Sequence, residues 1–531
     1  MKKKKVVIYV ICSIIKQITL RRDCVMSKID FNLLFAHSTT LNPREKKKKR
    51  KLWNRYIGIA LVVIQIIISI MFMFSLFHLN IVPTKYLIIL IVVLILITVF
   101  NWISQYSKAN IFGKIISVLL SIVLLTVFIF VSKASNTLYG LSKPLTATTS
   151  HISVIVLASD SAQELKDAKS YKFGYNSVID KSNTDKAITQ INQKLGSTID
   201  TSASVGWNEL VKALYNQGVN AIIFNEAYRS AIEETYPDFS TKTKVIDDSI
   251  ALENKNSIVA PADLNVSKDS FSIYIAGNDQ YGSISSEGRN DVNIIATFNP
   301  KTRQALLVTT PRDYYITLEN QAGNTGLDKL THAGQFGILG SITALQKLYG
   351  MNLDYYLKIN FTGTTELVDA LGGITIDSEV AFNSTWKPYS YVVGPNNCNG
   401  DQTLYFCRER YAFSDGDFQR GRDQTFAIKG IIAKASSPAI ITNYSAVLNS
   451  VSSLFETNMP TDTITTIIKD TINSSTPWNI QTYNVSGTGA SGDSYFFDLH
   501  DMSVVLPDYN TVTTAKDYMN RIRNGETFQV K

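Results

Sequence analysis

Arginine and aspartate residues recur at the ends of apolar runs in the C-terminal half of the chain. Arg and Asp open one such run at residues 289–297, and an Arg-Asp pair ends the next at residues 307–313. Further arginines occur at residues 408–410 and 416–424. Guanidinium groups bind phosphate oxygens through paired hydrogen bonds, and carboxylates beside them suit a hard divalent cation that bridges those oxygens. The pattern predicts a site for a pyrophosphate-bearing substrate with Mg2+.

The first group of candidate residues lies at the ends of predicted strands. Strands are predicted at residues 271–276, 291–298 and 304–310, and Pro300 marks the turn between the last two. In a layered sheet, functional side chains collect at strand ends. The residues placed there are Asp279, Arg289, Asp291, Arg312 and Asp313.

The second group of candidates lies after residue 400. Arg408 and Arg410 flank Glu409, so an extended backbone would present both arginines on one face. A helix predicted at 425–434 follows the other candidates, and the N–H groups of a helix start favour an anion. These candidates are Arg420, Arg422 and Gln424. A single arginine is more often a surface or ion-pair residue, so the convergence of the two groups is what favours a common site.

The elements around these residues alternate between strand and helix. Further strands are predicted at 354–359 and 374–376, and helices at 331–349, 362–371, 425–434, 441–455 and 462–472. This alternation predicts an α/β/α layered domain with a buried sheet. A smaller α/β module precedes it, with strands at 152–157 and 221–224 and helices at 162–169, 183–195, 207–217 and 228–236. It has no obvious catalytic cluster, so an accessory role is predicted.

The charge of the chain is distributed very unevenly. Residues 1–55 contain sixteen Lys and Arg against three Asp and Glu, and residues 56–150 contain five Lys and no acidic residue. Because the whole chain has a formal net charge of +8, residues 151–531 are acidic, at about −10. This acidic charge argues against a general nucleic-acid-binding role for the large C-terminal part.

Three uncharged apolar runs follow the basic N-terminal segment, at residues 56–78, 86–103 and 115–132. Each is long enough for a helix that spans a bilayer. The Lys/Arg cluster at residues 44–51 precedes the first run, which predicts a cytoplasmic N-terminus, and three crossings then place the chain after residue 132 outside the cell membrane.

Two features at the margins leave alternatives open. Residues 1–25 contain an apolar stretch too short to span a membrane, and Met26 resembles a natural start, so this segment is either an over-extended gene start or an interfacial helix. Cys398 and Cys407 either form a hairpin disulfide or remain two thiols.

Five ordered motifs resemble those of the LytR–CpsA–Psr family, specifically its capsule-locus CpsA branch. They occupy residues 289–293, 309–313, 328–333, 367–373 and 408–424. The resemblance is strong over residues 270–435 and extends to the accessory module and to the three-helix anchor. It implies a phosphotransferase that attaches capsular polysaccharide, or a related glycopolymer, from undecaprenyl pyrophosphate to peptidoglycan.

The resemblance also implies roles for individual residues. Asp279 and Asp291 would hold Mg2+ or another divalent cation, and Arg289, Arg312 and Asp313 would act in catalysis. The pyrophosphate would be bound by Arg289, Arg312, Lys329, Arg408, Arg410, Arg420, Arg422 and Gln424. The apolar face of residues 336–345, with Phe361, Leu367 and Leu371, would line a slot for the lipid or simply pack in a core.

The expected organisation is a basic cytoplasmic tail (1–55), three transmembrane helices (56–132), a linker (133–150), an accessory α/β domain (151–265) and a catalytic domain (266–531). The expected partners are the lipid-linked polysaccharide, peptidoglycan, membrane lipid and capsule-assembly proteins. One alternative function is a membrane-bound regulator of capsule synthesis whose basic tail binds DNA, although the tail has no helix-turn-helix pattern. A catalytically silent binder of the lipid carrier is the other.

Overall fold

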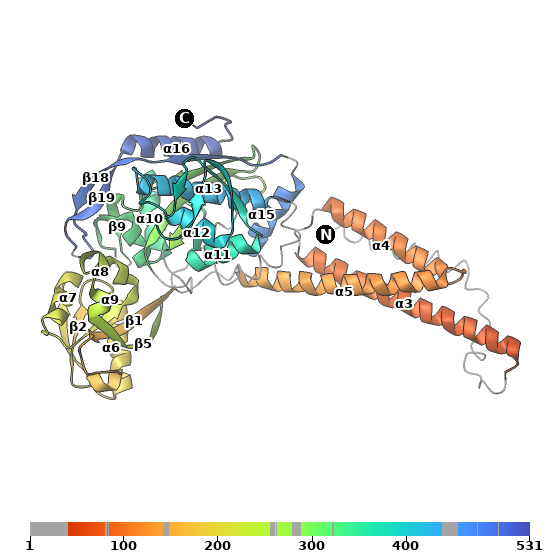
Figure 1. The fold of residues 1–531 in the computed structure, drawn as a ribbon, viewed down its shortest axis with the longest axis horizontal. Coiled ribbons are helices and arrows are strands. Elements are labelled where there is room, and N and C mark those ends of the chain that lie inside the picture. The colour runs from red at the N-terminus through yellow and green to blue at the C-terminus, as the bar shows by residue number, and fades with distance from the viewer. Residues whose placement is uncertain are drawn as a thin grey trace. The chain divides into compact units, whose positions relative to one another are not determined.

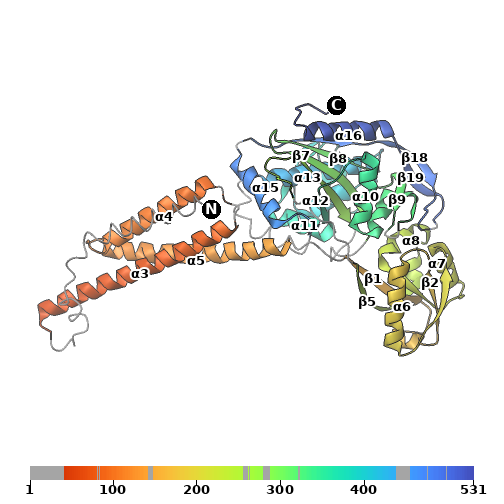
Figure 2. The ribbon, with the colours of Figure 1, turned by 180° about the vertical axis from the view of Figure 1, so that it is seen from behind.

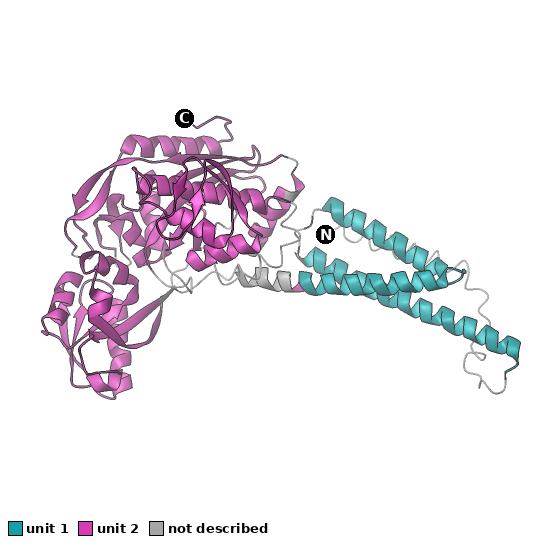
Figure 3. Cartoon of the chain, viewed as in Figure 1, with its two compact units in different colours: residues 1–78, 84–131 teal, residues 79–83, 132–531 magenta. Residues whose placement is uncertain are grey.

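The structure is a computed structural model that describes residues 41–79, 82, 84–141, 148–254, 261, 263–278, 288–320, 323–437, 455–474, 476–497 and 499–530. The chain folds as two compact units, residues 1–78 with 84–131 and residues 79–83 with 132–531 (Figure 3). Three predictions fall outside the described residues: the alternatives for residues 1–25, the position of Asp279, and the helix at 441–455 apart from Phe455.

The first unit contains three long helices, α3 (Pro43–Leu79), α4 (Thr84–Ser104) and the larger part of α5 (Asn110–Leu141). All three are long and apolar enough to cross a membrane, as predicted. Polar contacts join α3 to α4: Asn101 Nδ2 donates to Gln65 Oε1 at 2.8 Å, and Gln65 Nε2 donates to Thr98 Oγ1 at 3.1 Å. Such interhelical hydrogen bonds stabilise helix pairs in an apolar surrounding.

Residues 148–254 of the second unit form a five-stranded sheet with helices on both faces, here called the accessory module (Figure 1). The strand order is β3-β2-β4-β1-β5. The strands are β1 (Thr148–Leu157), β2 (Lys172–Asn176), β3 (Asp200–Ser204), β4 (Ala221–Asn225) and β5 (Thr243–Asn254). The helices are η2 (Leu165–Ala168), α6 (Lys181–Leu195), α7 (Trp207–Tyr215), η3 (Glu226–Tyr228), α8 (Arg229–Thr235) and α9 (Phe239–Lys242).

A mixed six-stranded sheet forms the centre of the remainder, in the order β16-β11-β6-β7-β8-β17. Its strands are β6 (Phe271–Asn278), β7 (Asn290–Asn299), β8 (Gln304–Thr309), β11 (Tyr355–Ile359), β16 (Phe455–Thr457) and β17 (Asn479–Asn484). Strand β6 pairs in parallel with β11, and β8 pairs in parallel with β17, whereas β7 runs antiparallel to both β6 and β8. The ends of β6, β8 and β11 therefore share one edge of the sheet with the start of β7.

Helices cover both faces of this sheet, which gives the predicted α/β/α layers (Figure 2). Ile295, Leu306 and Val308 face the core that contains α10 (Ile338–Tyr349) and α16 (Tyr509–Arg523). Ile294 and Leu307 face the opposite way and contact Ile428 of α13 (Asp417–Ala435). This alternation is the two-residue period of a strand buried on both sides.

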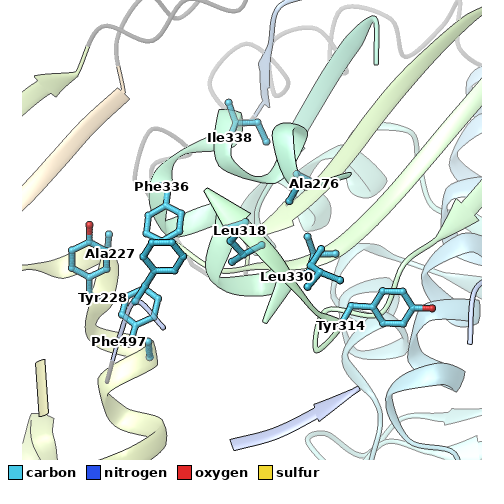
Figure 4. Close-up of a cluster of buried hydrophobic side chains, with 14 of the residues drawn as sticks. Ala227, Tyr228, Ala276, Tyr314, Leu318, Leu330, Phe336, Ile338 and Phe497 are labelled. Atoms are coloured by element: carbon cyan, nitrogen blue, oxygen red, sulfur yellow. The ribbon is translucent and has the colours of Figure 1, made fainter. Parts of the chain in front are cut away.

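One hydrophobic core runs from the accessory module into the six-stranded sheet (Figure 4). Tyr228 of the accessory module contacts Phe497 with ring centroids 5.6 Å apart, and Phe497 stacks on Phe336 at 6.2 Å. The two sheets belong to a single compact unit, so the domain boundary predicted near residue 265 stays a prediction.

The remaining elements surround the central sheet. They are β9 (Tyr315–Glu319), β10 (Thr325–Lys329), η4 (Leu330–Phe336), α11 (Phe361–Ala370), β12 (Ile374–Ser378), β13 (Phe382–Asn383), β14 (Ser390–Tyr391), β15 (Gly394–Cys398), α12 (Gly400–Arg408), α15 (Thr461–Asn473), β18 (Gly487–Gly492) and β19 (Met502–Pro507). The helix predicted at 331–349 is broken at Gly337, whose φ of 79° no helix interior accepts.

Candidate functional site

The predicted site residues converge at the shared edge of the six-stranded sheet. A cavity of about 340 Å3 lies there, between the ends of β6, β8 and β11, the start of β7, and helices α11, α12 and α13. We call it the arginine cavity. Seven predicted site residues line it: Arg289, Asp291, Arg312, Arg408, Arg410, Arg420 and Gln424.

Asp291 and Arg312 form the central ion pair of the cavity. Asp291 opens β7 and Arg312 follows β8, so the antiparallel pairing brings them together, with Arg312 Nη1 2.6 Å from Asp291 Oδ2. Thr331 Oγ1 donates to Asp291 Oδ1 at 3.2 Å. Burial alone would raise the pKa of Asp291, but the surrounding guanidinium groups, first that of Arg312, hold it well below its usual range. Asp291 is therefore an anion at any physiological pH.

Arg420 enters the cavity from the first turns of α13, where it forms an ion pair with Asp417. The helix starts at Asp417, eight residues before the start predicted from the sequence, so Arg420 and Asp417 are three residues apart on one helical face. Burial lowers the pKa of the Arg420 guanidinium and raises that of the Asp417 carboxyl. A carboxylate thus lies beside the guanidinium before any phosphate arrives.

The accessory module contributes a carboxylate to the same group of charges. Glu234 of α8 forms ion pairs with Arg289 and with Lys329, whose Nζ lies 3.1 Å from Glu234 Oε2. Lys329 also lies 3.8 Å from Asp313 Oδ1. Burial would raise the pKa of Glu234, but the neighbouring positive groups outweigh it and lower that pKa. Lys329 and Asp313 do not line the cavity, and Asp313 is a charge partner of Arg312, whose Nε lies 3.6 Å from Asp313 Oδ2.

Aromatic rings hold the two arginines at the end of α12. The Arg408 guanidinium lies 4.5 Å from the ring centre of Phe361 and 5.3 Å from that of Trp386, and Arg410 donates to the Tyr411 hydroxyl at 2.6 Å. Arg408 ends α12, and Glu409, which follows it, has an extended backbone conformation. Both arginines line the cavity.

Arg422 points away from the cavity. It forms ion pairs with Glu379 at 2.5 Å and Asp415 at 2.6 Å. Residues 420 and 422 lie on different faces of α13, since neighbours two apart on a helix are rotated by about 200°. The structure therefore does not place Arg422 with the other predicted pyrophosphate-binding residues.

Part of the cavity lining is apolar. The apolar side chains are those of Ile275, Val292, Ile359, Phe361, Leu404, Ala427, Ile428 and Ile431. Of the residues predicted for a lipid slot, only Phe361 lies here. Phe336, Leu345 and Leu371 pack instead in hydrophobic cores, which was the alternative considered from the sequence.

The residues described at this site fit a Mg2+ ion in their chemistry. Asp291 supplies an ionised, buried carboxylate, and Mg2+ usually takes one or two protein carboxylates and completes its octahedron with water and substrate oxygens. Within the described part of the chain, no group of three or more His, Cys, Asp or Glu side chains is arranged to hold a metal. The second predicted ligand, Asp279, lies outside that part.

Several residues of the site had no clear signal in the sequence. Asn278, at the end of β6, lines the cavity while it is 3% exposed, and its side-chain amide has no hydrogen-bond partner among the described residues. Asp417 would have been found by its three-residue spacing from Arg420 had the helix start been predicted correctly. Glu234 lies on α8 of the accessory module, so no local pattern reveals it. Cys398 and Cys407 are free thiols, and burial raises the pKa of Cys398 to about 11.

Comparison with known proteins gives a consistent result. Residues 234–506, just over half of the chain, match the LytR_cpsA_psr family. The polyisoprenyl-teichoic acid–peptidoglycan teichoic acid transferase TagU of Enterococcus faecalis is 32% identical over 206 residues, which cover 38% of this chain and 66% of that protein. The TagU of Bacillus subtilis is 30% identical over 239 residues, or 45% and 75% of the two chains. The crystal structure of B. subtilis TagV shares 21% identity and a TM-score of 0.41 over 49% of this chain and 99% of that one. The chain belongs to the LytR_cpsA_psr family.

Proposed function

We propose that this protein is a membrane-anchored phosphotransferase that attaches a glycopolymer to peptidoglycan. The carrier would be undecaprenyl pyrophosphate, and the cargo a capsular polysaccharide or related polymer. The observation that supports this most directly is a single cavity lined both by five arginine side chains and by a set of apolar side chains. Relatives at about 30% identity are named as transferases that join teichoic acid to peptidoglycan.

The guanidinium groups that line the cavity suit the pyrophosphate of a lipid-linked donor. Arg289, Arg312, Arg408, Arg410 and Arg420 approach it from four different segments of the chain. Guanidinium groups pair with phosphate oxygens in a fixed fork geometry. Carboxylates beside several of these guanidinium groups, such as Asp291 and Asp417, hold them in place before substrate binds, which reduces the reorganisation needed in the transition state.

The apolar part of the lining suits the first isoprene units of the lipid. It consists of branched aliphatic side chains from three strands and from α13, together with Phe361. An apolar pocket with a few convergent polar groups is the usual form of a small-molecule site. The donor would therefore lie with its tail among the aliphatic residues and its phosphates against the arginines.

In the proposed reaction, a hydroxyl oxygen of peptidoglycan attacks the phosphorus that carries the sugar. The bond from this phosphorus to the bridging oxygen breaks, so polyprenyl phosphate leaves and a phosphodiester joins the sugar to peptidoglycan, while the hydroxyl proton passes to water. Such a transfer depends on in-line positioning and charge neutralisation rather than on covalent catalysis by the protein. Arg312 is our candidate for stabilising the transferred phosphoryl group, with Arg289 and Asp313 positioned next to it.

Asp291, with Asp279 as predicted from the sequence, would hold a divalent cation. A bound Mg2+ would neutralise charge on the pyrophosphate oxygens. The part that Asp291 contributes is an anion oriented by Thr331 and Arg312.

The N-terminal helices would anchor the enzyme with its C-terminal unit outside the membrane. Residues 44–51 contain seven Lys and Arg and lie on α3. The same helix also forms the first candidate membrane span. This continuity supports a role as a topology signal and lipid-headgroup contact rather than as a separate DNA-binding element. A reporter fused after Ser150 should be active only outside the cell, and a cytoplasmic signal would refute the proposed function.

The transferase activity is tested with the full-length protein in detergent, a polyprenyl-pyrophosphoryl glycan and peptidoglycan fragments. The proposal requires glycan-bearing peptidoglycan and free polyprenyl phosphate in equal amounts. Release of polyprenyl pyrophosphate would instead indicate cleavage on the sugar side, and no product with any glycan donor would contradict a transferase.

A further inference from the structure

Two exposed aromatic side chains stand at the edge of the arginine cavity. Trp386 and Tyr411 are 49% and 58% exposed, yet both also line the cavity. Their ring centres lie 5.8 Å apart with 56° between the ring planes, so the rings form an open angle. We call this pair the aromatic platform. Large aromatic rings left in water need a reason, because they contribute most to stability when buried.

One buried carboxylate holds together the two segments that carry the platform. Glu409 is fully buried, and its two oxygens accept hydrogen bonds from the backbone N–H groups of Thr385 at 2.5 Å and Tyr411 at 2.9 Å. It also accepts from the Thr385 hydroxyl at 3.0 Å and from the N–H groups of Arg410 and Ala412. The loop that carries Trp386 and the turn that carries Tyr411 are therefore fixed to the same side chain.

A second set of contacts anchors the Trp386 loop from its other side. Lys387 Nζ lies 2.8 Å from an Asp401 oxygen on α12, and the Tyr389 hydroxyl donates to Asp401 at 2.5 Å. Below the loop, Phe382 and Tyr391 pack on Phe406. The exposure of Trp386 is thus not that of a mobile loop tip, because the segment around it is held by ion pairs, hydrogen bonds and a core.

The neighbours of the platform identify what it faces. Trp386 lies over the Arg408 guanidinium and Tyr411 over that of Arg410, at 5.3 and 4.7 Å. On the proposed function, those arginines hold the pyrophosphate and the apolar lining residues hold the lipid tail. The group attached to the phosphate that does not carry the lipid then lies next to the two rings. In the donor that group is the first sugar of the glycan.

We propose that Trp386 and Tyr411 form a saccharide subsite that binds the first sugar ring of the lipid-linked donor by stacking. The C–H groups on the face of a pyranose carry partial positive charge, and the face of an aromatic ring is negative. Two rings at an open angle accept one sugar face and one sugar edge. Stacking does not depend on any single hydroxyl, so the platform fits hexoses and N-acetylhexosamines as a class.

The test compares two probes on the full-length protein in detergent: farnesyl pyrophosphate, and farnesyl pyrophosphoryl-N-acetylglucosamine. The wild type should bind the sugar-bearing probe about tenfold or more tightly than the plain one, since stacking and burial of a ring contribute about 1.4 kcal/mol or more. Trp386→Ala and Tyr411→Ala should each remove most of this difference between the two probes, even where the lost contact with Arg408 or Arg410 also weakens the binding of farnesyl pyrophosphate. Trp386→Phe should keep most of the difference, because it keeps a ring.

Tyr509→Ala is the matched control, because Tyr509 is an equally exposed tyrosine on α16, 61% exposed and absent from the lining of the cavity. Equal weakening of both probes in Trp386→Ala and Tyr411→Ala would overturn the proposal, since the rings would then act only through Arg408 and Arg410. Equal affinity of the wild type for the two probes would overturn it as well. Failure of the wild type to bind farnesyl pyrophosphate at all would count against the proposed function itself, which keeps the two failures distinct.

Discussion

Replacing Arg312 with Ala removes the guanidinium that neutralises Asp291 most directly. The pair is 2.6 Å long, and its side chains are 11% and 18% exposed. Breaking a buried ion pair from one side destabilises a protein by about 3–5 kcal/mol, because the remaining charge loses its compensation. Asp291 keeps the hydrogen bond from Thr331 and the nearby charge of Arg420. We therefore expect the lower end, about 3 kcal/mol, and a melting temperature lowered by roughly 5 °C.

The double variant that combines Arg312→Ala with Asp291→Asn separates stability from activity. Asparagine keeps the shape of the side chain and removes its charge, so at least about 1.5 kcal/mol of the destabilisation expected from adding the single variants should disappear. Transfer should not recover, because the loss of one charged donor to a transition state costs about 2–4 kcal/mol, or roughly 30- to 1000-fold in rate.

Both quantities are measured on the full-length protein in detergent. Melting is followed by circular dichroism, and transfer by the release of polyprenyl phosphate from a lipid-linked glycan in the presence of peptidoglycan. Arg521→Ala is a matched control, since Arg521 of α16 pairs with Glu526 and does not line the cavity. Additive destabilisation in the double variant would refute the ion-pair argument. Normal transfer by Arg312→Ala would refute the assignment of Arg312 to the phosphoryl group.

Three further predictions concern pH, metal and the limits of the site. Burial raises the pKa of Asp423 to about 7. Its unfolded value is about 3.9, so folding takes up a proton between these values, and stability falls as the pH rises from about 4 to about 7, then levels off. Thermal melts should show that Asp423→Asn raises the melting temperature more at about pH 8 than at about pH 5. EDTA should abolish transfer, and Asp291→Asn should weaken Mg2+-dependent binding of polyprenyl pyrophosphate in calorimetry; full transfer in EDTA would remove the metal from the mechanism. In the same binding assay Arg420→Ala should lose about tenfold or more in affinity and Arg422→Ala about threefold or less. Equal losses would show that Arg422 also binds the pyrophosphate.

The sequence predicts best where burial is complete. The strands around Ile294 and Leu306 have apolar, buried centres, and both their existence and their position in a layered sheet were predicted correctly. Strand β3 was missed because its sequence, Asp200–Ser204, is polar and almost entirely exposed at the edge of its sheet. Such a strand exists because of its neighbour β2, and this neighbour is not visible in a local window of sequence.

The sequence predicted correctly which residues lie at the site where these residues stand at strand ends. It did so less well for residues on a helix, because the face on which they lie depends on where the helix starts. Asp291 and Arg312 follow from the antiparallel pairing of two evident strands. Arg422 was grouped with Arg420 because the start of α13 was predicted at residue 425 rather than at Asp417. Once both residues are on a helix, their spacing alone separates them. The roles of these residues in binding and catalysis stay predictions.

Glu234 gives the accessory module a significance that its own fold does not reveal. The module holds no cavity-lining residue, yet its α8 delivers one negative charge to Arg289 and Lys329. Glu234 is therefore a counter-ion for charges that lie outside the accessory module, and the module cannot be exchanged as an independent part. A fragment that begins at β6 would take one negative charge from the cluster around Arg289 and uncover the aromatic face of Phe497 that Tyr228 covers. Swapping in a module from another protein would retune the electrostatics of the site even if every residue that lines the cavity were kept.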